Sequence, residues 1–210
     1  MRTVWLFDLD NTLHDASAHI FPHINRSMTE YLACHLDLSE AEANALRMQY
    51  WLRYGATLRG LMRHHRHCDP RHFLRDTHTF EDLPGMLVAE RRMRAWLRRL
   101  PGRKVVFSNS PRKYANEVVR LLGIAPFIER VIGVEDLAFQ PKPQRLAYQR
   151  VLRAVKVPAA RCVMVEDTLD NLRVARQLGM RTVWISRRSG RPAFVDRHVR
   201  SVCSLRGWQR

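Results

Sequence analysis

Short apolar runs and helix-like segments alternate along much of the chain. Five runs that are rich in β-branched and aromatic residues read as strands, at residues 3–7, 104–107, 130–133, 162–165 and 182–185. Strands that alternate with helices are typical of parallel sheets. The pattern therefore predicts an α/β fold, with a Rossmann-like parallel sheet and helices on both of its faces.

Helical spacing fills the gaps between the later runs. Apolar residues at 115–122 recur at positions i, i+3, i+4 and i+7, and Gly123 follows where helices often end in a left-handed residue. The segment 172–178 repeats this pattern before Gly179, and a third helix is predicted around residues 146–155. These segments complete the predicted α/β units.

One segment breaks the alternation. From about residue 16 to residue 83 the sequence has helix-like stretches and no strand-like run, and Ser39 with Glu42 has the spacing of a capping box. We therefore expect an all-helical cap, residues 16–83, inserted after the first strand of a core made of residues 1–15 and 84–210. The last dozen residues are predicted to form a weakly ordered tail.

The chain is strongly basic. Its 210 residues carry a net charge of +16, and 32 of the 36 basic residues are arginines, with dense segments at 89–100 and from Arg187 onward. Two interpretations stay open at this point. The positive surface either binds nucleic acid or attracts anionic substrates, or it reflects solvated arginines that have no partner.

Membrane insertion and disulfide bonding find no support in the sequence. No apolar run approaches the roughly 20 residues that a membrane-spanning helix needs, and Asp8 interrupts the first run before it resembles a signal segment. The four cysteines lie far apart without a CxxC pair, which is typical of free thiols in a reducing compartment. We expect a cytoplasmic protein that has no membrane partner.

Polar residues follow four of the predicted strands. They are Asp8, Asp10 and Thr12 after the first run, Ser108 and Asn109 after the second, Lys142 in the segment after the third, and Glu166 and Asp167 after the fourth. Reactive groups in parallel sheets gather beyond the carboxyl ends of the strands. The sequence therefore predicts one site that these residues share.

The residue types at this edge suit phosphoryl transfer. Clustered carboxylates repel each other and take up protons unless a cation holds them ionised, and Mg2+ prefers oxygen ligands of this kind. One carboxylate can then attack phosphorus to form an aspartyl-phosphate, while a second moves protons to the leaving group and from water. Lys142 and the hydroxyl of Ser108 would stabilise charge on the phosphoryl oxygens.

These residues carry a family resemblance. Asp8-x-Asp10-x-Thr12, Ser108, Lys142 and the pair Glu166-Asp167 resemble the four motifs of the haloacid dehalogenase superfamily. The stretches FDLDNTL, YGATLRGL, FSNSPRKYA and RLLGI most resemble its pyrimidine 5'-nucleotidase branch. The resemblance extends to about residue 185. It implies a Rossmann-like core with a helical cap, magnesium dependence, and hydrolysis of nucleoside 5'-monophosphates.

The resemblance also implies roles for individual residues. Asp8 would be the nucleophile and a metal ligand, and Asp10 the general acid and base, with its backbone carbonyl on the metal. Ser108 and Lys142 would hold the phosphate, and Asp167 would complete the metal site.

Two further points concern binding. Thr12 and Asn109 are predicted substrate contacts beside the phosphate. The acid that often follows the metal-binding acid by four residues is replaced here by Asn171, with Asp170 one residue earlier, and the sequence leaves open which of the two supports the metal site.

The cap is expected to select the substrate, because the core recognises the phosphate alone. Within RYGATLRGL, Tyr54 is predicted to stack on a base and Arg59 to meet a carbonyl or phosphate group. The alternative is that Tyr54 packs inside the cap and the arginines are solvated.

The leading prediction is a magnesium-dependent phosphatase that acts on small phosphomonoesters through an aspartyl-phosphate, with pyrimidine nucleoside 5'-monophosphates as first candidates. A sugar-phosphate phosphatase and a phosphomutase of the same fold are alternatives. A basic nucleic-acid-binding protein is the alternative from another class. The base preference and the choice between monomer and dimer stay open.

Overall fold

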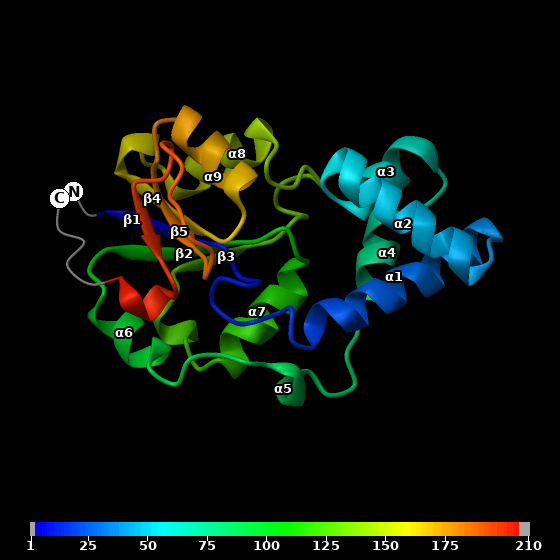
Figure 1. Ribbon diagram of the computed structural model, residues 1–210, viewed down its shortest axis with the longest axis horizontal. Helices are drawn as coiled ribbons and strands as arrows, with labels where there is room; N and C mark the ends of the chain where they lie inside the picture. Colours follow the sequence, from blue (N-terminus) through cyan, green and yellow to red (C-terminus); the bar gives the residue numbers. More distant parts are fainter. Residues whose placement is uncertain (1–2, 206–210) are drawn as a thin grey trace.

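The computed structural model describes residues 3–205, which form a six-stranded sheet in the order β3-β2-β1-β4-β5-β6 (Figure 1). Every neighbouring pair of strands is parallel. The strands are β1 (Val4–Phe7), β2 (Arg103–Phe107), β3 (Arg130–Ile132), β4 (Cys162–Glu166), β5 (Arg181–Ile185) and β6 (Arg197–Val199). The predicted parallel α/β fold is confirmed, and β6 adds a strand that the sequence pattern did not reveal.

Helices cover both faces of the sheet. Along β1, Trp5 and Phe7 face one hydrophobic layer while Val4 and Leu6 face the other, because successive side chains of a strand alternate. The first layer contains residues of α6 (Met93–Arg99) and α7 (Arg112–Leu121), and the second contains residues of α8 (Arg145–Val155) and α9 (Leu169–Gln177). Burial on both faces explains why these strands are continuous apolar runs.

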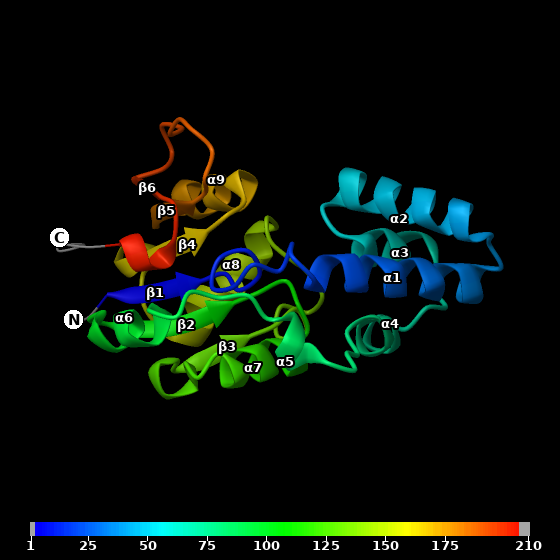
Figure 2. The same cartoon turned by 60° about the horizontal axis from the view of Figure 1, so that its bottom comes forward.

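Four helices follow β1 and lie to one side of the sheet, as Figures 1 and 2 show. They are α1 (Ile20–Leu36), α2 (Glu40–Tyr54), α3 (Thr57–His64) and α4 (Pro70–Thr77), and a short helix, α5 (Leu83–Met86), follows them. The four helices share a hydrophobic cluster of their own, which includes Leu32, Leu61 and Phe73. The inserted helical cap is thus confirmed, and its division from the core at residues 16 and 83 stays a prediction.

Local signals in the sequence set the shape of the cap. The capping box forms as predicted: Ser39 Oγ accepts from the backbone N–H of Glu42, and Glu42 Oε2 accepts from the Ser39 N–H at 2.9 Å. Helix α2 ends at Gly55, whose φ of 77° is left-handed. Gly60 lets α3 approach α2 closely, since a Cβ atom there would lie 2.1 Å from Tyr50 Cγ.

The predicted weakly ordered tail is wrong as far as residue 205, and residues 206–210 lie outside the described part. Val202 and Leu205 are buried in the core, and Trp96 Nε1 donates to the Leu205 carbonyl at 3.1 Å. These contacts anchor the segment against α6. Within residues 3–205 no helix is long and apolar enough to cross a membrane. The four cysteines are free thiols, as expected.

Candidate active site

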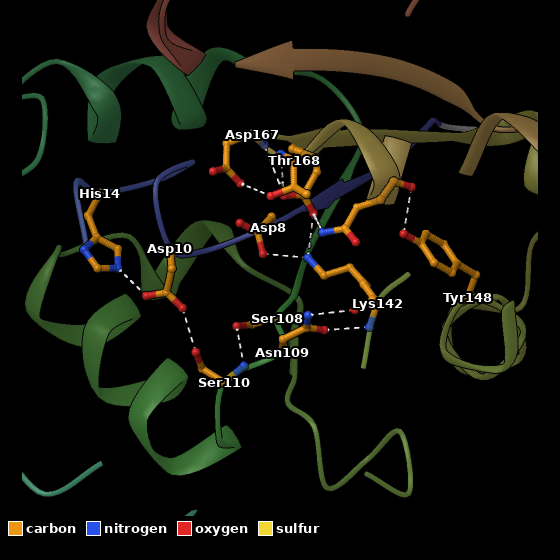
Figure 3. A network of polar contacts seen from close by, with 12 residues as sticks. Asp8, Asp10, His14, Ser108, Asn109, Ser110, Lys142, Tyr148, Asp167 and Thr168 are labelled. Carbon is orange, nitrogen blue, oxygen red and sulfur yellow. Dashed lines mark hydrogen bonds and ion pairs between the residues drawn. The ribbon is translucent and has the colours of Figure 1, made fainter. Parts of the chain in front are cut away.

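Strand register brings the predicted site residues to one edge of the sheet (Figure 3). The N–H of Asp8 donates to the Val165 carbonyl at 2.9 Å, so the chain leaves β1 level with the end of β4. The N–H of Ser108 donates to the Ile132 carbonyl at 3.0 Å, which ties the end of β2 to β3 in the same way. The groups that follow these strands therefore face a common space.

Lys142 lies at the centre of this space. Its Nζ donates to Asp8 Oδ1 at 2.6 Å and to Glu166 Oε2 at 2.8 Å, and all three side chains are buried. The Asn109 amide holds the Lys142 backbone in place: its Oδ1 accepts from the Lys142 N–H at 2.7 Å, and its Nδ2 donates to the Lys142 carbonyl at 3.1 Å. Asn109 thus orients Lys142, while its role as a substrate contact stays a prediction.

Burial and like charge perturb both carboxyl groups. Burial, followed by the charge of Glu166, raises the pKa of Asp8 to about 7, although Lys142 opposes the shift. The pKa of Glu166 is also raised to about 7, mainly by burial. Burial alone would lower the pKa of Lys142, but the charges of Asp8 and Glu166 outweigh it and raise that pKa. One ammonium group therefore serves two carboxyl groups that are difficult to ionise together.

A divalent cation fits this donor set. Asp8, Glu166 and Asp167 each offer a carboxylate oxygen, and these oxygens lie within 4.8 Å of one another. Burial also raises the pKa of Asp167. Oxygen ligands together with a deficit of positive charge suit Mg2+. The sequence predicts Asp10, not Glu166, as the third metal ligand. In the structure the Asp10 carboxyl points away from Asp8, Glu166 and Asp167, toward Ser110 and Tyr114. A metal contact by Asp10 through its backbone carbonyl stays a prediction.

Three donors surround the carboxyl group of Asp10. Oδ1 accepts from Tyr114 Oη at 2.8 Å and lies 3.0 Å from His14 Nε2, and Oδ2 accepts from Ser110 Oγ at 2.6 Å. We refer to His14, Ser110 and Tyr114 as the Asp10 clamp. Burial would raise the pKa of Asp10, but the hydrogen bonds of the clamp outweigh it and leave that pKa below its usual value.

A tight turn after β1 places His14 beside Asp10. The N–H of Leu13 donates to the Leu9 carbonyl at 2.8 Å, and Asn11 adopts a left-handed φ of 62°. The turn brings the fourth residue after Asp10 back to it. Neither His14 nor Tyr114 was predicted from the sequence. The available signal was the spacing of four residues between Asp10 and His14, which predicts a contact if a tight turn follows β1.

The structure separates Asp170 from Asn171. Asn171 is buried, and its Nδ2 donates to Glu166 Oε2 at 3.0 Å. Asp170 is exposed and pairs with Arg173 at 2.6 Å. We refer to Asp8, Glu166 and Asp167 as the acidic group. Asn171 supports this group through its bond to Glu166, whereas Asp170 faces solvent.

Thr12 and Ser108 follow β1 and β2 at the edge of the sheet that also carries Asp8 and the acids at the end of β4. Thr12 is buried, and its Oγ1 has no hydrogen-bond partner among residues 3–205. Ser108 is buried and accepts from the Ser110 N–H at 2.9 Å. Thr12 and Asp167 line a cavity of about 830 Å³. The buried Thr12 hydroxyl without a partner is typical of a position that binds a polar group of a ligand.

The predicted recognition segment of the cap lies against the loop that carries Lys142. A Cβ atom at Gly55 would lie 3.8 Å from Pro143 Cδ. Tyr54 is half-buried, and its hydroxyl lies 2.6 Å from His64 Nε2. Arg59 donates to the Tyr54 carbonyl at 2.9 Å, so part of its guanidinium closes the end of α2. The structure brings this turn next to the core, and ligand contacts by Tyr54 and Arg59 stay predictions.

Comparisons with known proteins agree with this arrangement. Phosphate metabolism protein 8 of Saccharomyces cerevisiae is 24% identical over 195 residues, which cover 85% of this chain and 60% of that protein. The chain therefore spans less than two thirds of this relative.

Two solved structures share the fold. The crystal structure of a HAD phosphatase from Thermococcus onnurineus aligns with a TM-score of 0.66 and 22% identity, over 96% of this chain and 94% of its own. A mutant of CbbY from Rhodobacter sphaeroides in complex with xylulose-(1,5)bisphosphate aligns with a TM-score of 0.69 and 21% identity, over 99% and 98%.

The family assignment rests on a broader match. The family model described as haloacid dehalogenase-like hydrolase matches residues 3–179, and those residues contain every side chain of the acidic group and of the Asp10 clamp. The pyrimidine 5'-nucleotidase branch stays a prediction. The chain belongs to the haloacid dehalogenase-like hydrolase family.

Proposed function

We propose that this chain is a magnesium-dependent phosphatase that hydrolyses small phosphomonoesters through an aspartyl-phosphate on Asp8. The observation that carries the proposal is the pairing of two carboxyl groups with different surroundings. Asp8 lies against Lys142 and the other acids, whereas Asp10, two residues later, is held by the Asp10 clamp. Different environments for two neighbouring acids suit one nucleophile and one proton carrier.

In the first step an oxygen of Asp8 attacks phosphorus, and the bond from phosphorus to the leaving oxygen breaks. Asp10 is ionised before the substrate binds; it takes up a proton when the negative phosphate binds beside it, because nearby negative charge raises its pKa. It gives that proton to the leaving oxygen, so that an alcohol leaves. Lys142, Ser108 and the unpartnered Thr12 hydroxyl stabilise the phosphoryl oxygens. Asp8, Glu166 and Asp167 would hold Mg2+, which neutralises charge on the phosphate when bound.

In the second step a water molecule attacks the phosphorus of the aspartyl-phosphate. Asp10 now takes the proton of the water, and the bond between phosphorus and the Asp8 oxygen breaks. Inorganic phosphate leaves, Asp8 is again a carboxylate, and Asp10 releases its proton to solvent and is ionised again. A phosphomutase would instead return the phosphoryl group to the substrate.

The substrate that we propose first is a nucleoside 5'-monophosphate, with a pyrimidine base as the first choice. The support is Tyr54, whose neighbour Gly55 lies against Pro143 and whose ring has the guanidinium groups of Arg53 and Arg63 at 5.5 and 5.8 Å. Aromatic rings with neighbouring arginines are platforms for nucleobases. A sugar phosphate is the second candidate, because the aligned CbbY structure holds a sugar bisphosphate.

The proposal also assigns a role to each domain of the chain and a location in the cell. Residues 16–83 act as the cap that selects the substrate, and residues 1–15 and 84–210 act as the core that carries out the chemistry. Four free thiols support a cytoplasmic location.

Phosphate release from nucleoside monophosphates and sugar phosphates tests the proposal, with Mg2+ or with a chelator. Asp8→Asn should lower turnover by about 10³-fold or more, because it removes the nucleophile. Circular dichroism should show that the variant is folded. Turnover that persists in Asp8→Asn, or that ignores the chelator, contradicts the mechanism. Release from sugar phosphates alone keeps the mechanism and rejects the nucleotide.

A further inference from the structure

We propose that His14 is a positioning residue that, together with Ser110 and Tyr114, fixes the Asp10 carboxyl for proton transfer to the leaving group. The inference rests on the proposed function, because it assigns the proton to Asp10. It adds a role for a buried histidine that the mechanism above does not use.

The His14 side chain is buried and forms one hydrogen bond, to Asp10, among the described residues. Its side chain has 0% exposure, and Nε2 lies 3.0 Å from Asp10 Oδ1. A carboxylate accepts hydrogen bonds only, so Nε2 carries the proton and donates. Nδ1 is buried without a partner among the described residues. A buried imidazole costs free energy that an apolar side chain would not, so the bond to Asp10 is what the imidazole contributes at this position.

The clamp reaches Asp10 from two parts of the chain, the turn after β1 and the stretch that leads from β2 into α7. His14 comes from the connection after β1, Ser110 from the loop after β2, and Tyr114 from α7. Together they occupy both carboxyl oxygens. The Tyr114 ring is itself held by His78 and Phe80, whose ring centroids lie at 5.8 and 5.4 Å, in the segment that returns from the cap. Rotation of the Asp10 carboxyl would therefore break several contacts at once.

This arrangement has a consequence for the first chemical step. When Asp10 gives up its proton, a carboxylate forms, and donors that already point at both oxygens stabilise it without rearrangement. The benefit depends on how much the leaving oxygen needs a proton. An alkoxide needs one, whereas 4-nitrophenolate leaves without it.

A leaving-group series tests the proposal. We would measure kcat/KM, which reports on formation of the aspartyl-phosphate, with saturating Mg2+ for substrates from 4-nitrophenyl phosphate to alkyl phosphates. His14→Leu should lower kcat/KM for alkyl phosphates by about 10- to 100-fold and change it little for 4-nitrophenyl phosphate. His14→Gln, whose amide can still donate, should recover part of the loss.

Two further variants separate positioning from packing. Leu13→Ala opens a cavity at the neighbouring buried position and should change kcat/KM by the same factor for every substrate. Tyr114→Phe removes one donor and keeps the ring, so it should steepen the leaving-group dependence even if His14→Leu fails to fold. Losses in His14→Leu and Tyr114→Phe that are equal across the series would overturn the inference.

Asp10→Asn distinguishes this inference from the proposed function. If Asp10→Asn leaves the leaving-group dependence unchanged, Asp10 is not the proton donor, and that part of the proposed function fails together with the inference. If Asp10→Asn steepens the dependence while the clamp variants do not, the proposed function stands and the role of His14 fails. Steeper dependence in both supports both.

Discussion

Lys142 shows how a single residue couples the site to the stability of the fold. A lysine side chain with almost no exposure needs negative partners, and Asp8 and Glu166 supply two. When both carboxyl groups are ionised, their negative charge exceeds the positive charge of the one ammonium group. Their pKa values of about 7 express this imbalance. The arrangement therefore favours a further cation beside these acids.

Without Mg2+, the free energy of unfolding should fall as pH rises toward about 7. Asp and Glu side chains titrate near pH 4 in the unfolded chain, whereas Asp8 and Glu166 keep their protons up to about pH 7 in the folded chain. Between these values the folded state binds more protons, so its stability decreases as pH increases. Mg2+ should therefore raise Tm more at about pH 8 than at about pH 5.5.

Differential scanning fluorimetry with Mg2+ or a chelator measures this difference. The control is a double variant, Asp8→Asn with Glu166→Gln, in which neither group titrates and the pH dependence of the Mg2+ effect should disappear. A Tm increase that is the same at both pH values in the natural chain would show that these carboxyl groups do not bind the ion.

At the level of elements, the contact of α2 with α3 sets the position of the turn that faces Pro143. Gly60 allows the two helices to approach, and Gly55 ends α2 in a left-handed conformation beside Pro143. A side chain at residue 60 would push against Tyr50. The geometry of the predicted recognition segment thus depends on one glycine in the cap.

Gly60→Ala should destabilise the cap by about 1–3 kcal/mol, because its Cβ atom would overlap the Tyr50 ring. We expect KM for a nucleoside monophosphate to rise several-fold, with a smaller change for 4-nitrophenyl phosphate. Ser39→Ala is the matched control: it weakens α2 at its other end by about 1 kcal/mol and should leave KM unchanged. Equal KM changes in the two variants would mean that cap stability alone is responsible.

The sequence predicts elements better than it predicts contacts between them. Five strands are visible because burial on both faces requires apolar runs, but β6 has three half-buried residues and gives no such run. Asp8, Ser108 and Lys142 are predictable because strand ends converge. The Asp10 clamp is not, since His14 depends on the turn at Asn11 and Tyr114 depends on how α7 packs against the sheet.

At the scale of the whole molecule, two arginine-rich segments that lie far apart in the sequence become neighbours. Helix α6 belongs to the segment 89–100, and residues 200–205 belong to the segment that begins at Arg187. The helix and residues 200–205 lie side by side, as Figures 1 and 2 show, and Trp96 bonds to Leu205. Glu90 and Met93 of the first segment line the same cavity as Asp167 and as the exposed arginines of the second segment, which are Arg187, Arg188 and Arg200. Arg187, Arg188 and Arg200 therefore place positive charge on the wall of the cavity that Asp167 also lines.

This placement predicts that salt should weaken substrate capture. The net charge of +16 should attract a dianionic phosphomonoester, and salt screens this attraction. We therefore expect kcat/KM to fall by about 10-fold as ionic strength rises from about 0.02 to about 0.5 M, while kcat stays nearly constant. The double variant Arg187→Gln with Arg188→Gln should show a shallower dependence. Arg153→Gln with Lys156→Gln, at the end of α8 that lies farther along the chain from Lys142, removes the same charge and should keep the steep dependence.

The same variants decide between attraction of substrate and binding of nucleic acid. A fluorescent DNA oligonucleotide without a terminal phosphate cannot be a substrate, so anisotropy reports on binding alone. Affinity that decreases steeply with salt and is lost in Arg187→Gln with Arg188→Gln would assign this side to nucleic acid. We expect weak binding that both double variants reduce equally, because both remove the same charge. Steering of a small substrate at the cavity requires only that Arg187 and Arg188 raise the positive potential near Asp167. A kcat/KM independent of salt would contradict steering by this side of the molecule.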